Sequence, residues 1–203
     1  MTLVLSGCYV EAGDTGCHRL QPGDVIWHQA YESHLDRFEV RGADVWVIEL
    51  PGRWSGGLFG SVADADEIVR VGEGSAADAF KLLAECFVPA SAPEGDWPEQ
   101  LARDLRADPS LSLSQWASGR GLHASSLSRG FSQMFGTTPA SYRATQRAIQ
   151  ALEAVRATNT PLSQIAAQCN FADQAHMSRA IAALTGSSPA AVRRHSAGFA
   201  FPG

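Results

Sequence analysis

The amino-acid sequence predicts an α+β protein in which a small antiparallel β unit precedes an all-α domain of seven helices with two helix-turn-helix motifs. Strand-like segments fill residues 1–50, and helical patterns follow Trp97. One stretch of sixteen residues is followed by a similar stretch 50 residues later. The 203 residues, 45% hydrophobic and 18% charged, are ordinary for one or two globular domains. We place the boundary near residue 95, which gives domains 1–95 and 96–203.

The first half contains four apolar segments that are typical of strands because they are rich in Val, Ile, Trp and Phe: "LVLSGCYV", "DVIW", "RFEV" and "DVWVIEL". Turn signals separate them at Ala12-Gly13-Asp14, Pro22-Gly23-Asp24 and Arg41-Gly42-Ala43. The Gly-rich and acidic residues 51–74 predict a loop. Residues 75–88 predict a helix that Ser75 caps, with Phe80, Leu83 and Phe87 on its apolar face. "PASAPEGD" then predicts a linker.

Seven helical segments follow the linker. In the third, Leu127, Phe131 and Met134 lie at i, i+4 and i+7 and predict a buried stripe, and the sixth has Met177, Ile181 and Leu184 at the matching positions. A Thr-Pro or Ser-Pro pair begins the fourth, fifth and seventh helices, since Pro is tolerated at the first helical position. The predicted ranges are 98–107, 111–121, 124–135, 139–157, 161–170, 173–184 and a short helix from 189.

The repeated stretch reads "SRGFSQMFGTTPASYR" at residues 128–143 and "SRAIAALTGSSPAAVR" at residues 178–193, with six of sixteen positions identical. Each copy belongs to a short helix, a tight turn and a second amphipathic helix, which is the pattern of a helix-turn-helix. The helix that joins the copies, residues 139–157, is about 28 Å long at about 1.5 Å per residue. Successive major grooves on one side of B-DNA are about 34 Å apart. The spacing therefore predicts entry into two adjacent grooves.

Charge is divided unequally between the two halves. Residues 1–99 contain 6 basic and 17 acidic residues, whereas residues 100–203 contain 10 basic and 4 acidic residues, so the net charges are −11 and +6. All ten basic residues of the second half are Arg, whose planar guanidinium suits phosphates and guanine. This asymmetry indicates a polyanionic partner for the second half.

Short polar side chains surround one Arg on the exposed face of each second helix of the motifs. The predicted faces carry Ser125, Ser128, Arg129 and Ser132 in the first motif and Ala175, Ser178, Arg179 and Ala182 in the second, with Gln174 and His176 in its first turn. Arg can then bond guanine and Gln can bond adenine. Alternatives stay open: each Arg can instead bond a carboxylate or a phosphate, His176 can serve the helix terminus, and His123 can end the turn.

Residues 98–195 resemble the DNA-binding unit of the AraC/XylS family of bacterial transcription regulators, most specifically through "PLSQIAAQCNFADQAHMSRAIAALTGSSPAAVRR". The resemblance implies a seven-helix unit in which Ser125, Ser128 and Arg129 read one groove. It also implies that the next groove is read by Gln174, Ala175, His176, Ser178 and Arg179. Asn170 stands where the family usually has a turn Gly, and Asn tolerates the same left-handed conformation.

The segment "LQPGDVIWHQAYESHLDRF" resembles the second conserved stretch of cupin barrels, with Gly23 and His34 at matching positions. The first stretch, with its His-x-His and Glu, is absent, so the resemblance implies a shortened cupin-like sensor. A metal-dependent cupin enzyme, or a metal or thiol sensor through Cys8 and Cys17, is the alternative. Its candidate ligands are His18, His28 and His34, but no carboxylate at ligand spacing is evident. We therefore expect no metal, no cofactor and no catalytic residues.

Taken together, the sequence predicts a cytoplasmic, sequence-specific transcription regulator that is not an enzyme. Its expected partner is double-stranded DNA. A small-molecule effector, a second copy bound through the helix at residues 75–88, and RNA polymerase are further candidate partners. The sequence has no basic amino terminus followed by an apolar run and no apolar stretch of about 18 residues. It therefore predicts no membrane partner.

Overall fold

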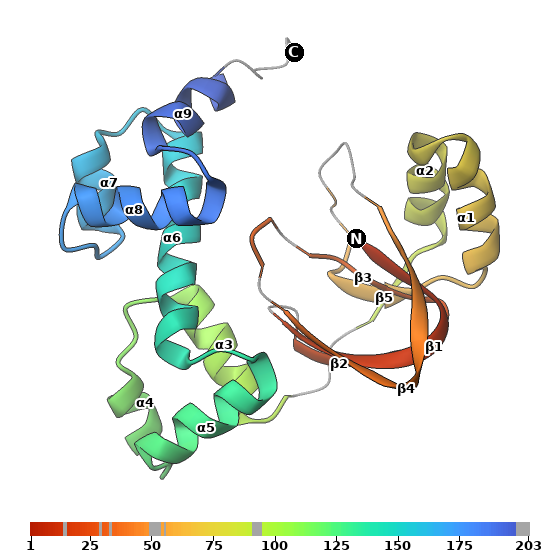
Figure 1. The fold of residues 1–203 in the computed structure, drawn as a ribbon, viewed down its shortest axis with the longest axis horizontal. Coiled ribbons are helices and arrows are strands. Elements are labelled where there is room, and N and C mark those ends of the chain that lie inside the picture. Colours follow the sequence, from red (N-terminus) through yellow and green to blue (C-terminus); the bar gives the residue numbers. More distant parts are fainter. Residues whose placement is uncertain are drawn as a thin grey trace. The chain divides into compact units, whose positions relative to one another are not determined.

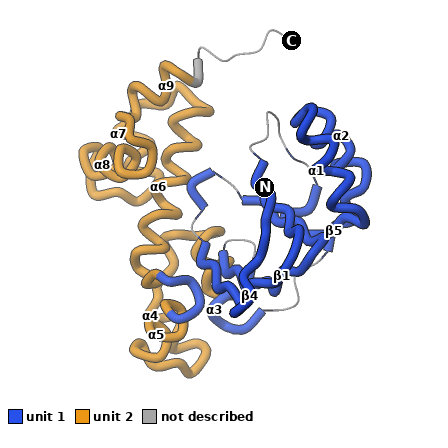
Figure 2. The backbone as a smooth tube through the Cα atoms, turned by 45° about the vertical axis from the view of Figure 1, so that its right-hand side comes forward, with its two compact units in different colours: residues 1–100, 133–136 blue, residues 101–132, 137–203 orange. Residues whose placement is uncertain are grey.

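A computed structural model of the chain describes residues 1–13, 16–28, 30–32, 34–48, 54, 56–90 and 95–197. The chain forms two compact units, one of residues 1–100 and 133–136 and the other of residues 101–132 and 137–203 (Figure 2). Strands precede a series of helices along the chain (Figure 1). The predicted α+β class, with a small antiparallel unit before an all-α domain, is confirmed.

The first unit is built around one antiparallel sheet. Its strands are β1 (Thr2–Gly13), β2 (Gly16–Leu20), β3 (Asp24–Ile26), β4 (Leu35–Val47), β5 (Phe59–Ser61) and β6 (Val88–Pro89). The order is β2-β1-β3-β5-β6, and β4 also pairs with β1, along most of its length. Because side chains alternate along a strand, Leu3 and Val25 pack into one apolar cluster, and Val4 and Ile26 into another.

β4 corrects the prediction of two short strands separated by a turn at Arg41-Gly42-Ala43. The strand runs unbroken from Leu35 to Val47. Its register against β1 shifts between Gly7, which faces Ala43, and Tyr9, which faces Phe38. Gly42 has a φ of 69° and its carbonyl lies where a side chain on Gly7 would begin. The glycines therefore form an irregularity within a long strand pair, not a chain reversal.

Residues 51–74 were expected to form a loop, and this was wrong for the part that the structure describes. They contain β5 and the helix α1 (Ala65–Gly74), whose N-cap Asp64 accepts a hydrogen bond from the backbone N–H of Glu67. Ile68 is the buried residue of this helix. Residues 51–53 and 55 lie outside the described residues, as do residues 91–94 of the predicted linker and Asp14 of the first predicted turn.

The predicted helix at residues 75–88 is α2 (Ala76–Cys86), and Ser75 caps it by accepting from the backbone N–H of Asp78. Ala79 and Leu83 on its apolar face are fully buried in the same cluster as Leu3 and Ile68. This face thus covers the core of its own unit. The apolar face of this helix was the reason to expect a dimer interface there, and it no longer supports that expectation.

Seven helices follow in the described residues from Trp97 onward. They are α3 (Trp97–Ala107), α4 (Leu113–Gly119), α5 (Ala124–Phe135), α6 (Pro139–Ala157), α7 (Leu162–Gln168), α8 (Gln174–Thr185) and α9 (Pro189–Ala197). The side chain of Thr138 caps α6 by accepting from the backbone N–H of Ser141, and Pro139 occupies the first helical position. The fully buried Ala151, Leu152 and Val155 of α6 form part of the core of the helical domain.

Candidate nucleic-acid interface

The two helix-turn-helix motifs, α4–α5 and α7–α8, have the same turn. In the first, the N–H of Gly121 donates to the carbonyl of Ser118 at 3.1 Å, and in the second the N–H of Asn170 donates to that of Ala167 at 3.2 Å. Gly121 and Asn170 have φ values of 66° and 57°. Both turns therefore depend on a left-handed residue, and Asn170 adopts the conformation that the usual Gly would take.

The second helix of each motif buries the same stripe. Leu127 and Phe131 of α5 are buried and Met134 is half-buried, and the corresponding residues of α8 repeat this pattern: Met177, Ile181 and Leu184. Because 3.6 residues make a helical turn, the residues between the stripe positions lie on the other face. This fixes which side of α5 and α8 is open to a partner.

The predicted reading residues lie on that open face. Among the eight, seven are exposed and Ser178 is half-buried; the exposed ones are Ser125, Ser128, Arg129, Gln174, Ala175, His176 and Arg179. Ser132 and Ala182, which were predicted to extend the two faces, are half-buried. The widest access is thus near the amino-terminal ends of the two helices.

A histidine lies near the amino-terminal end of each of these helices. Nδ1 of His123, just before α5, shares a 2.8 Å hydrogen bond with the hydroxyl of Ser125 and accepts from its backbone N–H at 3.4 Å. At the start of α8, the carboxylate of Asp173 accepts from the backbone N–H of His176 at 2.6 Å. The His176 ring lies edge-on to Phe171 at 5.2 Å between centroids, so its orientation is restricted before any base is bound.

Arg side chains of the helical domain have two distinct environments. Arg129 on α5 and Arg179 on α8 are exposed and make no hydrogen bond or ion pair with the described part of the chain. Arg143 instead donates from Nη1 to the carbonyl of Leu111 at 3.3 Å. Arg193 donates from Nη2 to the carbonyl of Thr160 at 2.8 Å and from Nε to that of Val155 at 3.3 Å.

The bonds of Arg143 and Arg193 were missed by the sequence analysis. Leu111 and Thr160 stand just before the first helix of each motif, so each Arg ties the segment after a motif back to the segment before it. The signal that could have found them is present in the repeat, because both copies of the sixteen-residue stretch end in Arg. These side chains fix the geometry of the motifs and are not available to bases.

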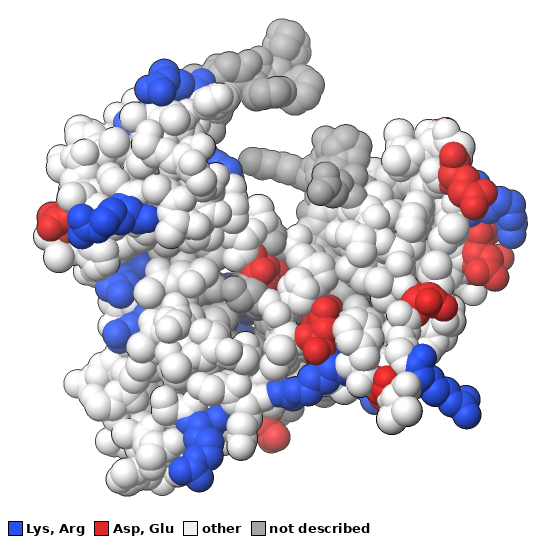
Figure 3. Space-filling view, viewed as in Figure 1, with Lys and Arg blue, Asp and Glu red and all other residues white. Residues whose placement is uncertain are grey.

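The long helix α6 sets the separation of the motifs. Its 19 residues correspond to about 28 Å, with α4 and α5 near one end and α7 and α8 near the other (Figure 1). Arg side chains are visible over the helical domain in Figure 3, with few carboxylates among them. Repeated geometry and an excess of cationic side chains are the properties expected of a surface that binds a regular polyanion.

Comparison with known proteins identifies the helical domain. Residues 116–195 match the family described as "Helix-turn-helix domain". None of the described helices has the length and apolar character needed to cross a membrane. A search of curated proteins gives no match.

Three solved structures are similar to parts or most of the chain. A probable AraC family transcriptional regulator from Rhodopseudomonas palustris has 18% identity and a TM-score of 0.44, over 48% of this chain and 94% of that one. The DNA-binding domain of AdpA in complex with a target DNA has 22% identity and a TM-score of 0.47, over 54% and 100%. Apo ToxT K231A from Vibrio cholerae has 12% identity and a TM-score of 0.48, over 95% and 87%.

These identities and TM-scores are low, so the identification depends on the family match together with the two motifs described above. That match lies within residues 98–195, the part of the sequence that resembles the AraC/XylS regulators. The C-terminal domain is an AraC-type helix-turn-helix domain, and the chain is a DNA-binding transcription regulator.

Proposed function

We propose that this regulator reads DNA with α5 and α8 in two successive major grooves, through a DNA-binding domain of residues 96–203. The observation that carries the proposal is the repetition of one geometry: the same turn, the same buried stripe and the same exposed Arg recur in both motifs. A duplex presents the same groove once per helical turn, so a surface that repeats along one rigid helix fits it.

Arg129 and Arg179 are the residues we assign to base reading. Both are exposed and have no partner among the described residues, so neither must break a bond before it meets DNA. Their neighbours Ser128 and Ser178 are short, which allows the helix to approach the base edges. A guanidinium so placed can bond O6 and N7 of guanine in a fork. Phosphate contacts would supply much of the affinity and would make it depend on salt.

We assign smaller contributions to DNA recognition to the remaining predicted residues. Gln174 in the first turn of α8 can bond adenine, and Ala175 leaves room for a thymine methyl group. We assign His176 to a phosphate, because its ring is held against Phe171. Ser125 shares its hydroxyl with His123, and so it is expected to contribute to the position of α5 more than to the choice of base.

The test is selection of bound duplexes from a random DNA pool with the full-length protein, repeated with Arg129→Ala and Arg179→Ala. Each substitution should relax the preference at one base position and weaken binding of the preferred duplex by about 1–3 kcal/mol. The two affected positions should lie about one helical turn apart, about 10 base pairs. Arg103→Ala on α3 is the matched control, since Arg103 is exposed and lies outside both motifs.

Two outcomes would contradict the proposal. If Arg129→Ala and Arg179→Ala changed the preference at the same position, the motifs would not occupy separate grooves. If either variant weakened all duplexes equally and left every base preference unchanged, that Arg would contact the backbone and read no base.

For residues 1–95 we propose a regulatory role, with no catalytic step assigned to them. The unit has its own sheet, its own core and two helices that cover that core, so it can respond to a ligand as an independent element. Adding a candidate effector to the duplex-binding assay tests this role. An effector that shifts the affinity of the full-length protein but not of an N-terminal variant defective in effector binding would support it.

A further inference from the structure

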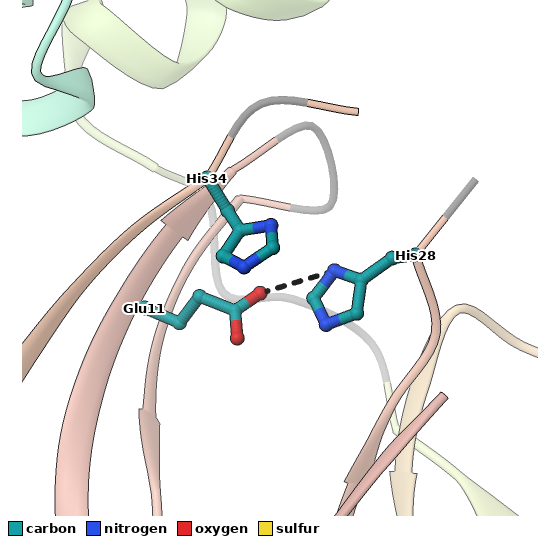
Figure 4. A group of neighbouring side chains, drawn as sticks. All are labelled: Glu11, His28 and His34. Atoms are coloured by element: carbon teal, nitrogen blue, oxygen red, sulfur yellow. Dashed lines mark ion pairs between the residues drawn. The ribbon is translucent and has the colours of Figure 1, made fainter. Parts of the chain in front are cut away.

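Three side chains from separate segments of the N-terminal unit converge on one point. Glu11 lies on β1, His28 follows β3, and His34 precedes β4 (Figure 4). One ligand atom from each side chain lies within 4.8 Å of the other two. The sequence analysis considered His28 and His34 but identified no carboxylate to accompany them. The long β1 strand supplies it from 17 residues before His28.

Glu11 is a buried acid without adequate hydrogen bonding. Its side chain is 1% exposed, and Oε1 has no hydrogen-bond partner among the described residues. The nearest polar atom recorded for Oε1 is Nδ1 of His28, at 3.5 Å, and this nitrogen also has no hydrogen bond. Oε2 accepts a long bond of 3.4 Å from the hydroxyl of Tyr9. Buried polar atoms are nearly always hydrogen-bonded, so two such atoms that face each other at 3.5 Å without a hydrogen bond require a physical reason.

The charges around Glu11 make the arrangement more costly without a cation. Burial, followed by the carboxylates of Asp36 and Glu32, raises the pKa of Glu11 to about 8. Burial, followed by His34 and the chain's amino terminus, lowers the pKa of His28 to about 4. Metal ligands bind in their deprotonated forms, so a bound cation would take the place of a proton on the Glu11 carboxyl and on the ligating nitrogen of His28.

Two imidazoles and one carboxylate form a well-known donor set for transition metals. With bonds of about 2.0–2.2 Å, neighbouring ligand atoms are about 3–3.5 Å apart, and the 3.5 Å between Glu11 Oε1 and His28 Nδ1 meets this spacing. The ligand atom of His34 lies within 4.8 Å of the other two. His34 is exposed, so its ring can move until its nitrogen reaches the spacing of metal ligands, and a metal can enter from that side. The other nitrogen of His28, Nε2, lies 3.4 Å from the hydroxyl of Thr2, which can orient the ring as an outer partner does.

We propose that Glu11, His28 and His34 bind one divalent first-row transition-metal ion, such as Zn²⁺, in the N-terminal unit. The set differs from the first cupin stretch, which this chain lacks, because its carboxylate comes from β1 and one imidazole from the end of β3. Three protein ligands leave coordination positions for water or a small anion. The nitrogen donors favour a transition metal over Mg²⁺ or Ca²⁺, which prefer oxygen. The site does not depend on the proposed mode of DNA reading.

The test is equilibrium dialysis of chelator-treated, full-length protein against micromolar Zn²⁺, with metal analysis of the retained protein. One Zn²⁺ per chain is expected, with no retention of Mg²⁺. Glu11→Gln and His34→Asn should each weaken binding at least tenfold. His34 is exposed, so its variant keeps the fold and remains informative if Glu11→Gln misfolds. His195→Gln is the matched control, because His195 is an exposed imidazole on α9, and it should retain full binding.

Substitution with Co²⁺ distinguishes this site from binding to the four free cysteines. The proposed ligands give visible d–d bands without thiolate charge-transfer absorption in the near ultraviolet. Equal binding by the wild-type protein, Glu11→Gln and His34→Asn would overturn the proposal. Strong thiolate absorption, or no Zn²⁺ retained at micromolar concentration, would overturn it as well.

Discussion

The turn of the first motif permits a prediction in which two neighbouring glycines respond to the same substitution with opposite sign. Gly119 is the last residue of α4, and Gly121 lies in the turn with a φ of 66°. A Cβ added at either position meets no atom within 4 Å. Steric clashes therefore do not contribute, and only backbone conformation determines the change in stability.

The expected magnitudes follow from that conformation. Ala in a helical position is more stable than Gly by about 0.5–1 kcal/mol, so Gly119→Ala should raise the free energy of unfolding by that amount. An L-residue in the left-handed region costs about 1–2 kcal/mol, partly offset by the lower entropy of the unfolded chain. Gly121→Ala should therefore lower the free energy of unfolding by about 1 kcal/mol. The two variants should differ by about 2 kcal/mol.

The assay is native-state hydrogen exchange of α6 amides in the full-length protein, because it reports the opening of the helical domain separately from that of the N-terminal unit. Asn170→Gly in the second motif is a third variant, and it should change stability little, since Asn already tolerates a φ of 57°. If Gly121→Ala stabilised α6 as much as Gly119→Ala does, the left-handed turn, and with it the position assigned to α5, would be refuted.

Three further predictions concern single contacts. Asp173→Ala removes the N-cap of α8 and should cost about 1 kcal/mol in urea unfolding; a smaller loss in Asp173→Asn would agree with capping by the side-chain oxygen. Arg193→Lys cannot reach both of its carbonyl partners and should lower stability by about 1 kcal/mol, with no change in base preference in the duplex selection. The pKa of Glu11 is about 8 in the folded chain and 4.5 when unperturbed, so its protonated form stabilises the fold below pH 4.5 and this contribution is lost as the pH rises through 8. In metal-free buffer, Glu11→Gln should thus raise the free energy of unfolding by about 3 kcal/mol at pH 7 and have little effect at about pH 4; equal effects at both pH values would contradict this.

The helical domain could be predicted closely because its signals are local. The bounds of α5 and α6 match the predicted ranges 124–135 and 139–157. Thr138 and Pro139 specify where α6 begins, and the apolar stripe of α5 has the period of a helix. Which residues contact the bases stays a prediction. These contacts depend on how the domain is positioned on a DNA duplex, and the protein sequence does not specify that position.

The N-terminal unit was less predictable because its structure depends on distant partners. Gly42 reads as a turn in the sequence, but β1 pairs with residues on both sides of it and continues the strand. The helix α1 lies in a segment rich in glycine and acidic residues and ends in a glycine, and this composition favoured a loop in the sequence. Glu11 lies in the apolar run "CYVEAG", which hints at burial. β1 pairs with β3 at Thr2 and Leu3, so the approach of Glu11, at the other end of β1, to His28 comes from the fold of the whole sheet and not from a local pattern.

Recurrence in the repeat cannot by itself distinguish an exposed Arg, which we propose to read bases, from a structural one, since each kind occurs in both copies. Arg129 and Arg179 recur 50 residues apart, and so do Arg143 and Arg193. Their position relative to the buried residues separates them. Arg129 lies midway between the buried Leu127 and Phe131, about 200° around the helix from each, so it must face solvent.

Arg143 and Arg193 each follow a buried residue directly, Tyr142 and Val192, and are half-buried where main-chain carbonyls are within reach. A guanidinium at the edge of a core loses hydration and must find other acceptors, and the carbonyls before each motif supply them. The repeat therefore preserves two kinds of Arg together. One pair holds each motif in shape, and that fixed shape exposes the other pair, which we propose to read bases.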